Sequence, residues 1–223
     1  MGFCFQAAEG DNATLDCLFD WHARHPEVTH FDVEANREVE HADHPEGHRR
    51  WSTKRYATMA TLRNRLLERV CCLAPDRFLS LDSDILLESS KTISELVRLT
   101  ETMDVVAPLT YMTPEGVEFP NTMTWVGPAG NRALRWTPYP IGTLYKADVV
   151  MAVVMMTPPV YSKARYQVHP QGEDLGWAAS CAEHGFALWS ASWLYTPHIM
   201  HRWQLESYLD SGDPRGSNTC CPI

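Results

Sequence analysis

The sequence predicts an α/β fold, with a mixed, mainly parallel sheet flanked by helices. Short apolar segments alternate with longer amphipathic ones along most of the chain, as strands and helices do in such folds. Residues 78–81 and 149–156 have the length and composition of buried strands. Acidic and other polar residues follow several apolar segments, where open α/β sheets bind ligands. We therefore expect a ligand site at one edge of the sheet.

Composition indicates an ordinary globular protein. The chain has 223 residues, of which 44% are hydrophobic and 21% charged, enough for a substantial core. We expect one domain over residues 1–203 and a C-terminal tail over 204–223. The formal net charge of −9 argues against a general nucleic-acid coat, because no basic surplus is present to neutralise phosphates.

The sequence favours a cytoplasmic protein without a membrane span. It shows no basic segment of a signal peptide, and its longest apolar run, 149–156, is too short to cross a bilayer. Its seven cysteines include no C-x-x-C pair, which is typical of reduced thiols in the cytosol.

Helix signals are clearest in the first half of the chain. Asp11 or Asn12 caps a helix over 13–24, and Ser52 or Thr53 starts the strongest amphipathic helix, which continues to about residue 72. The other elements expected in this half are strands over 2–6, 28–33 and 78–81 and a helix over 92–100.

Strand signals dominate the second half. Residues 122–126 and 132–137 flank the turn signal Gly127–Asn131 and predict a hairpin. Glu173 opens a helix that ends at Gly185, because glycine suits the position after a helix. The remaining expected strands cover 105–109, 149–156 and 186–195.

Two carboxylates, Asp82 and Asp84, follow the predicted strand over 78–81. Unpaired carboxylates are unfavourable in a buried strand, since burying an uncompensated charge costs several kcal/mol. Residues two apart on an extended backbone point the same way, so both oxygens can meet one hard cation. The pair therefore indicates a metal site at this strand end.

Three further groups are candidates for the same site. Arg63 lies in the middle of the long helix, and Glu173-Asp174 open a later one. His198 and His201 follow the last strand. The first two groups also have a structural explanation, because acidic residues are favoured in a first helical turn and basic residues on a solvated helix face.

A loop carries three histidines, His41, His44 and His48, whose spacing suits zinc if the loop were helical. Pro45 and Gly47 oppose a helix there. We therefore interpret the three as solvated loop residues.

In order and spacing, these motifs resemble a nucleotide-sugar-dependent glycosyltransferase of the GT-A type, family-2-like and of the compact bacterial or phage kind. The likeness spans about residues 1–202. It implies a Rossmann-like GT-A fold and transfer of a hexosyl group from a UDP- or GDP-sugar to an acceptor hydroxyl. The acceptor would be a glycan, a small molecule or a modified nucleic-acid base.

The resemblance also implies a divalent cation, which neutralises the leaving diphosphate. Its ligands fall on Asp84 and Asp82, and on His198, with His201 as the substitute. Carboxylates with an imidazole suit Mn²⁺ well and Mg²⁺ less well.

Catalytic and donor-binding roles follow from the same resemblance. Asp174 would be the general base for the acceptor hydroxyl, and Glu173 would bind acceptor or donor sugar. Arg63 would contact the diphosphate or the base. The remaining nucleotide contacts would come from Gln6, Glu34 and Asn36.

Two other functions stay open. A nucleotidyltransferase that makes nucleotide sugars shares the metal carboxylates, but the loop over residues 6–10 lacks the basic residue such enzymes usually carry. A non-catalytic sugar or nucleotide binder would use tryptophans as stacking surfaces, and turnover would separate it from an enzyme. The candidate tryptophans are Trp51, Trp125, Trp136, Trp177, Trp189, Trp193 and Trp203.

Overall fold

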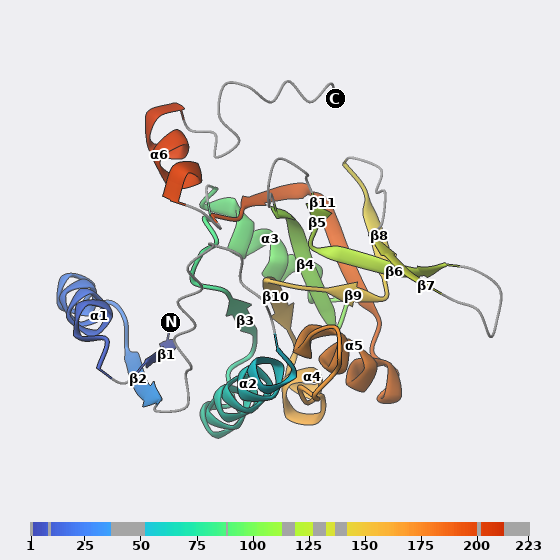
Figure 1. Ribbon diagram of the computed structural model, residues 1–223, viewed down its shortest axis with the longest axis horizontal. Coiled ribbons are helices and arrows are strands. Elements are labelled where there is room, and N and C mark those ends of the chain that lie inside the picture. Colours follow the sequence, from blue (N-terminus) through green and yellow to red (C-terminus); the bar gives the residue numbers. More distant parts are fainter. Residues whose placement is uncertain are drawn as a thin grey trace.

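The computed structural model describes residues 2–8, 10–36, 52–87, 89–112, 119–126, 133–136, 142–199 and 202–211. Over these residues the chain forms a central mixed sheet, two smaller sheets and helices packed around them (Figure 1). This confirms an α/β fold and corrects its expected details.

An N-terminal unit consists of β1 (Gly2–Ala8), α1 (Asn12–Arg24) and β2 (His30–Asn36). The two strands pair in parallel along their whole length. Alternate residues point to opposite faces, so the aromatic side chains of Phe3, Phe5 and Phe31 share one face and pack against Trp21 of α1. Asp11 caps α1, as expected, by accepting from the Thr14 N–H.

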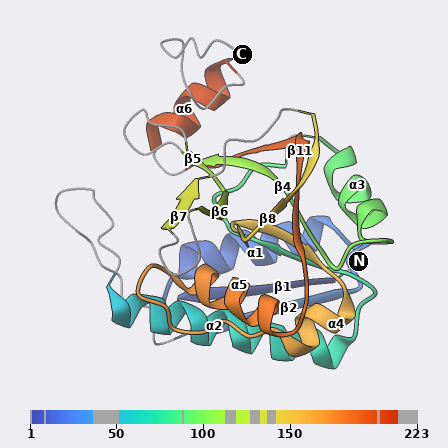
Figure 2. The ribbon, with the colours of Figure 1, turned by 90° about the vertical axis from the view of Figure 1, so that its right-hand side faces the viewer.

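Helix α2 (Thr53–Leu73) links this unit to the rest of the molecule. Ser52 caps it, and the helix ends at Ala74, which takes a left-handed conformation. It contacts β1 on one side and α4 (Pro158–Lys163) and α5 (Glu173–Glu183) on the other (Figure 1). Figure 2 shows α2 running lengthwise below β1 and β2.

The central sheet has the strand order β3-β10-β4-β11-β8, with β5 paired to β4. The expectation of a mainly parallel sheet was wrong, because in this sheet β4 and β11 are parallel and the other pairs are antiparallel. Two of these antiparallel pairs arise because β10 inserts between β3 and β4, and the other two are made by β8 with β11 and by β5 with β4. The bounds are β3 Phe78–Leu81, β4 Val105–Met112, β5 Phe119–Pro120, β8 Leu144–Ala147, β10 Val153–Met156 and β11 Leu188–Pro197.

The strand expected over 149–156 is two strands that belong to different sheets. β9 (Val149–Val150) pairs with β6 (Thr122–Val126), whereas β10 enters the central sheet. The chain turns at Ala152, whose φ is +67°, and Val153 N–H donates to Met151 O at 2.8 Å across the turn. The expected hairpin is confirmed, since β6 pairs antiparallel with β7 (Ala133–Trp136).

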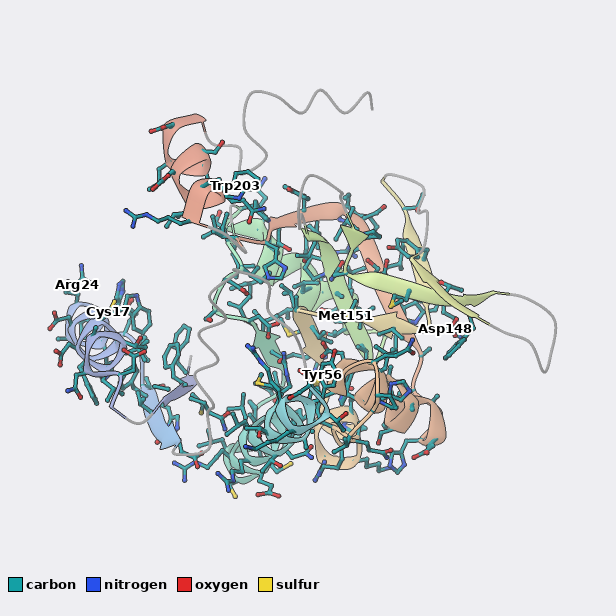
Figure 3. The ribbon with its side chains drawn as sticks, viewed as in Figure 1. Cys17, Arg24, Tyr56, Asp148, Met151 and Trp203 are labelled. Atoms are coloured by element: carbon teal, nitrogen blue, oxygen red, sulfur yellow. The ribbon has the colours of Figure 1, made fainter. Side chains whose placement is uncertain are left out.

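The last elements differ from the expectation in extent. α3 (Lys91–Leu99) and α5 lie where they were predicted, and β11 continues two residues further, to Pro197. The short α4 was not predicted. α6 (Arg202–Ser211) crosses residue 203, the expected end of the domain, and carries the exposed Trp203 (Figure 3).

Among the described residues, no helix is long and apolar enough to cross a membrane. Some predictions fall outside the described residues. These are the turn over 127–131, the ligand His201, and the loop histidines His41, His44 and His48; of Asn36 only the backbone is described.

Candidate active site

The segment after β3 is joined to the segment after β11. Leu86 N–H donates to Pro197 O at 2.9 Å, and Ile199 N–H donates to Asp84 O at 2.7 Å. Ile85 and His198 form an isolated antiparallel bridge between them. These backbone contacts bring the Asp-x-Asp motif and the C-terminal histidine motif together, although more than a hundred residues separate them.

Asp84 and His198 meet through their side chains. Asp84 Oδ1 lies 3.1 Å from His198 Nε2, and the histidine is only 8% exposed. Its other ring nitrogen, Nδ1, is buried and has no hydrogen-bond partner. The contact places a carboxylate oxygen and an imidazole nitrogen at a separation that two ligands of one ion can share.

Arg63 reaches the same strand end from α2. Its Nη2 donates to Asp82 Oδ1 at 2.9 Å, and its Nε lies 3.3 Å from Glu173 Oε1. Its guanidinium carbon lies 5.4 Å from the centre of the Tyr166 ring. Burial by itself lowers the pKa of Arg63, but Asp82, Asp174 and Glu173 raise that pKa well above its usual value. The guanidinium therefore stays charged among three carboxylates.

The turn that leads into α5 is fixed by Asn64. Its side chain donates to Tyr166 O and accepts from Tyr166 N–H, both at 2.8 Å. Gly176 lets this turn lie against α5, because a Cβ at that position would fall 2.1 Å from Gln167 O. Gly172 precedes the helix with a φ of +131°, a value that side chains disfavour.

Glu173 and Asp174 differ in environment although they are neighbours. Glu173 is buried beside Arg63, and Asp174 is partly exposed. Although part of Asp174 reaches the surface, the surrounding protein removes water from its carboxyl group, and this desolvation raises the pKa of Asp174 to about 7. Arg63 opposes the increase, and the charges of Glu173 and Asp82 add to it. At neutral pH the Asp174 carboxyl group can therefore both accept and release a proton.

Burial and the Glu173 charge also raise the pKa of Tyr56, which lies on α2 (Figure 3). Asn64, 102 positions earlier, holds the backbone of Tyr166, and the charge that acts on Tyr56 belongs to another helix. Local spacing therefore could not place either tyrosine at this site.

Two of the predicted nucleotide contacts, Gln6 and Glu34, lie on β1 and β2 of the N-terminal unit. Gln6 donates from Nε2 to Leu62 O at 2.8 Å and so holds β1 against α2. Glu34 is partly buried on β2, on the same side of the strand as Asp32.

The six other described candidates form two adjoining groups. Arg63 lies among Asp82, Glu173 and Asp174, and Asp84 contacts His198.

Asp82, Asp84 and His198 do not form a group in which one ligand atom from each residue lies within 4.8 Å of the other two. Within the described residues, the group whose three donor atoms lie within 4.8 Å of one another is a different one, Cys4, His30 and Asp32.

Known structures show the fold of the chain. The crystal structure of A197 from STIV is 14% identical in sequence, with a TM-score of 0.52, over 89% of this chain and 85% of that one. This likeness supports a Rossmann-like arrangement at a coarse level. No curated protein matches the chain.

The amino-acid sequence matches a model of a protein family. Residues 4–129, more than half of the chain, match the model of the glycosyltransferase family 25 N-terminal domain. The matched segment contains Arg63, Asp82 and Asp84, which form half of the site described above. The order of the motifs had suggested a family-2-like enzyme, but this match shows that the chain belongs to glycosyltransferase family 25.

Proposed function

We propose that this protein transfers a hexosyl group from a nucleoside-diphosphate sugar to an acceptor hydroxyl, with a divalent cation, as GT-A enzymes do. Family membership supports sugar transfer, with a donor and an acceptor. The observation that carries the finer proposal is the meeting of Asp84 with His198 beside the Arg63–Asp82 pair.

Asp84 and His198 would hold the cation, which is Mn²⁺ or, less favourably, Mg²⁺. Their ligand atoms lie 3.1 Å apart, and the donor set combines a hard oxygen with an imidazole nitrogen, which suits Mn²⁺. When bound, the cation neutralises the negative charge that develops on the departing diphosphate. Diphosphate oxygens of the donor would complete its coordination.

Arg63 would orient Asp82 for the donor. Its guanidinium holds one carboxylate oxygen of Asp82 and leaves the other for the ribose or the cation. Because three carboxylates surround Arg63, its charge also limits the repulsion that an incoming diphosphate meets.

Asp174 would take the proton from the acceptor hydroxyl. It lies at the N-terminus of α5, partly exposed, and its pKa of about 7 suits a general base near neutral pH. Glu173 is more deeply buried and faces Arg63, so we assign it to holding Arg63 and the sugar side of the site. Gln6, Glu34 and Asn36 remain proposed contacts to a UDP or GDP moiety.

Donor binding and turnover test this proposal directly. We expect one class of nucleoside-diphosphate sugar to raise the melting temperature in the presence of Mn²⁺, and the same donor to be hydrolysed or transferred. Asp84→Ala should abolish Mn²⁺-dependent turnover, whereas Asp76→Ala, which removes an exposed carboxylate just before β3, should not.

The outcome also separates the other functions. Donor binding without turnover would indicate a binding module, and formation of a nucleotide sugar from a sugar phosphate and a nucleoside triphosphate would indicate a nucleotidyltransferase. Unchanged Mn²⁺-dependent activity in folded Asp84→Ala would refute the metal assignment.

A further inference from the structure

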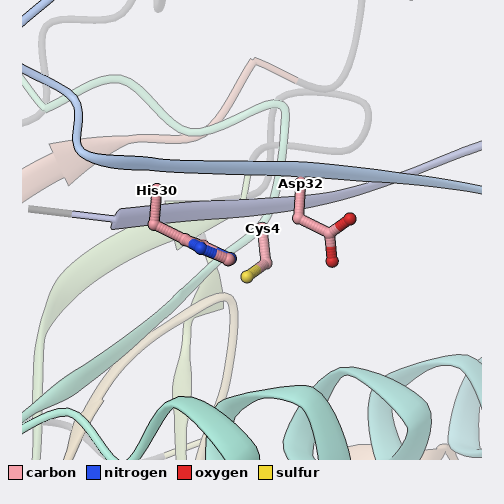
Figure 4. A group of neighbouring side chains, drawn as sticks. All are labelled: Cys4, His30 and Asp32. Carbon is pink, nitrogen blue, oxygen red and sulfur yellow. The ribbon is translucent and has the colours of Figure 1, made fainter.

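Outside the two groups that Arg63 and His198 join, Cys4 of β1 and His30 and Asp32 of β2 form a compact group of donor side chains. One ligand atom from each lies within 4.8 Å of the other two (Figure 4). The parallel register accounts for the grouping, because Cys4 pairs with Asp32, and His30 precedes Asp32 by two residues on the same face. The aromatic contacts with α1 lie on the opposite face.

His30 supplies a second, independent observation. Its Nε2 is buried and has no hydrogen-bond partner. Buried polar atoms are nearly always paired, so the unpaired nitrogen of an imidazole that lies beside a thiol and a carboxylate supports a ligand at this group. A metal ion is the ligand that all three side chains can bind at once.

The charges around the group suit a divalent cation. Arg69 of α2 donates to one oxygen of Asp32, Oδ2, through both Nε and Nη2. This fixes the orientation of the carboxylate and leaves Oδ1 for a cation. The carboxylate of Glu34 also attracts Arg69, so the positive charge of Arg69 is offset. Two negative donors, a Cys4 thiolate and Asp32, then match the charge of the ion.

We propose that Cys4, His30 and Asp32 bind a zinc ion, with solvent as the fourth ligand. Sulfur, imidazole nitrogen and carboxylate oxygen together form a zinc donor set, distinct from the oxygen-rich set of the Asp-x-Asp motif. Zinc bonds of about 2.0–2.3 Å in a tetrahedron place donor atoms about 3.3–3.8 Å apart. Since the three ligand atoms lie within 4.8 Å of one another, the side chains need to close by no more than about 1.5 Å.

The ion would join β1 to β2. Within the described residues these strands pair only with each other, and α1 and α2 cover their two faces. A bond from each strand to one metal would therefore stabilise the N-terminal unit, and bound zinc should raise its resistance to unfolding.

Cobalt provides a spectroscopic test with the full chain. Metal-free protein titrated with Co²⁺ should show the charge-transfer band of a cobalt–thiolate bond at one equivalent, and Zn²⁺ should remove it. Cys4→Ser should lose the band, and Cys17→Ser, which changes an exposed cysteine of α1, should keep it. A band that survives in Cys4→Ser, or that never forms in the wild-type chain, would overturn the proposal.

A measurement on the unmodified chain guards against a variant that fails to fold. Saturating Zn²⁺ should slow alkylation of Cys4 by roughly tenfold or more, because the metal holds the thiolate, while alkylation of Cys17 should not change. Mass spectrometry of the two peptides gives both rates from one sample. Equal alkylation of Cys4 with and without zinc would contradict the site.

Discussion

Asp174 combines a position at a helix N-terminus with a pKa raised to about 7 by burial. If it is the general base, Asp174→Asn should lower turnover by roughly two to four orders of magnitude. The wild-type rate should rise with pH through about 7, because the base acts only when deprotonated, and the variant should lose this dependence. Initial rates over a pH series measure both effects.

Donor affinity and product stereochemistry serve as controls for Asp174. The donor KM should change little in Asp174→Asn, since the carboxylate acts on the acceptor's proton. If donor binding is lost together with turnover, Asp174 binds the donor. NMR of the product should show inversion of the anomeric centre, whereas retention would remove the need for an acceptor-side base.

His198 should affect the metal requirement and not the fold. We expect His198→Ala to raise the Mn²⁺ concentration for half-maximal activity by roughly tenfold or more, because one ligand beside Asp84 is lost. His184→Ala, at the exposed end of α5, is the matched control. An unchanged Mn²⁺ dependence would mean that His198 only supports Asp84.

At the level of elements, the turn at Ala152 positions the Asp-x-Asp motif. Ala152 O accepts the Asp82 N–H at 2.9 Å, and the buried Asn121 holds Met151 O and Pro108 O with its amide. A residue other than glycine at a φ of +67° is strained, at a cost of about 1–3 kcal/mol. The strain lies directly beside a proposed ligand carboxylate.

The stability of variants at Ala152 should therefore depend on how well the new residue tolerates a positive φ. We expect Ala152→Gly to change the free energy of unfolding by less than about 1 kcal/mol, because relief of strain offsets the greater freedom of the unfolded chain. Ala152→Val should destabilise by roughly 2–4 kcal/mol, since a β-branched residue fits the left-handed region poorly. Denaturant unfolding compares the three chains, and equal stability would contradict the turn.

Element positions were predictable from the sequence where a local signal defined them. The caps at Asp11 and Ser52 set the starts of α1 and α2 to within one residue. Strand direction was not predictable, because it depends on the long-range insertion of β10 between β3 and β4. The two-proline helix α4 is too short for a periodic pattern to reveal it.

In the candidate active site too, the sequence predicted the residues with a local signal and missed the contacts between distant segments. The motif residues Asp82, Asp84 and His198 were identified from their order along the chain, although their roles remain proposals. The double hydrogen bond between Asn64 and Tyr166, in contrast, joins residues 102 positions apart. No local pattern encodes such a contact.

Across the whole molecule, α2 connects the two proposed metal sites. Leu62 O accepts from Gln6 of β1, and the next residue, Arg63, holds Asp82. Two turns further along, Arg69 holds Asp32. One rigid helix thus fixes both the N-terminal unit and the end of β3.

Stability of the whole chain should depend on the ionisation of Asp174. Its folded pKa, about 7, is above its unfolded value of 3.8, so between these pH values the folded state binds more protons than the unfolded state. The stabilisation is therefore fully present below about pH 4 and is lost as pH rises through about 7. One pKa unit is worth about 1.4 kcal/mol, and partial exposure reduces the effect to roughly 1–3 kcal/mol.

The comparison of wild type with Asp174→Asn isolates this contribution, because the other titrating groups are common to both chains. Urea unfolding at about pH 5 and about pH 8 should show that the wild type loses more stability than the variant as pH rises. Glu173→Gln is a poor substitute, since it breaks the ion pair with Arg63. If the two chains change in parallel between these pH values, the Asp174 carboxyl group is already ionised at pH 5, and its assignment as a base with a raised pKa fails.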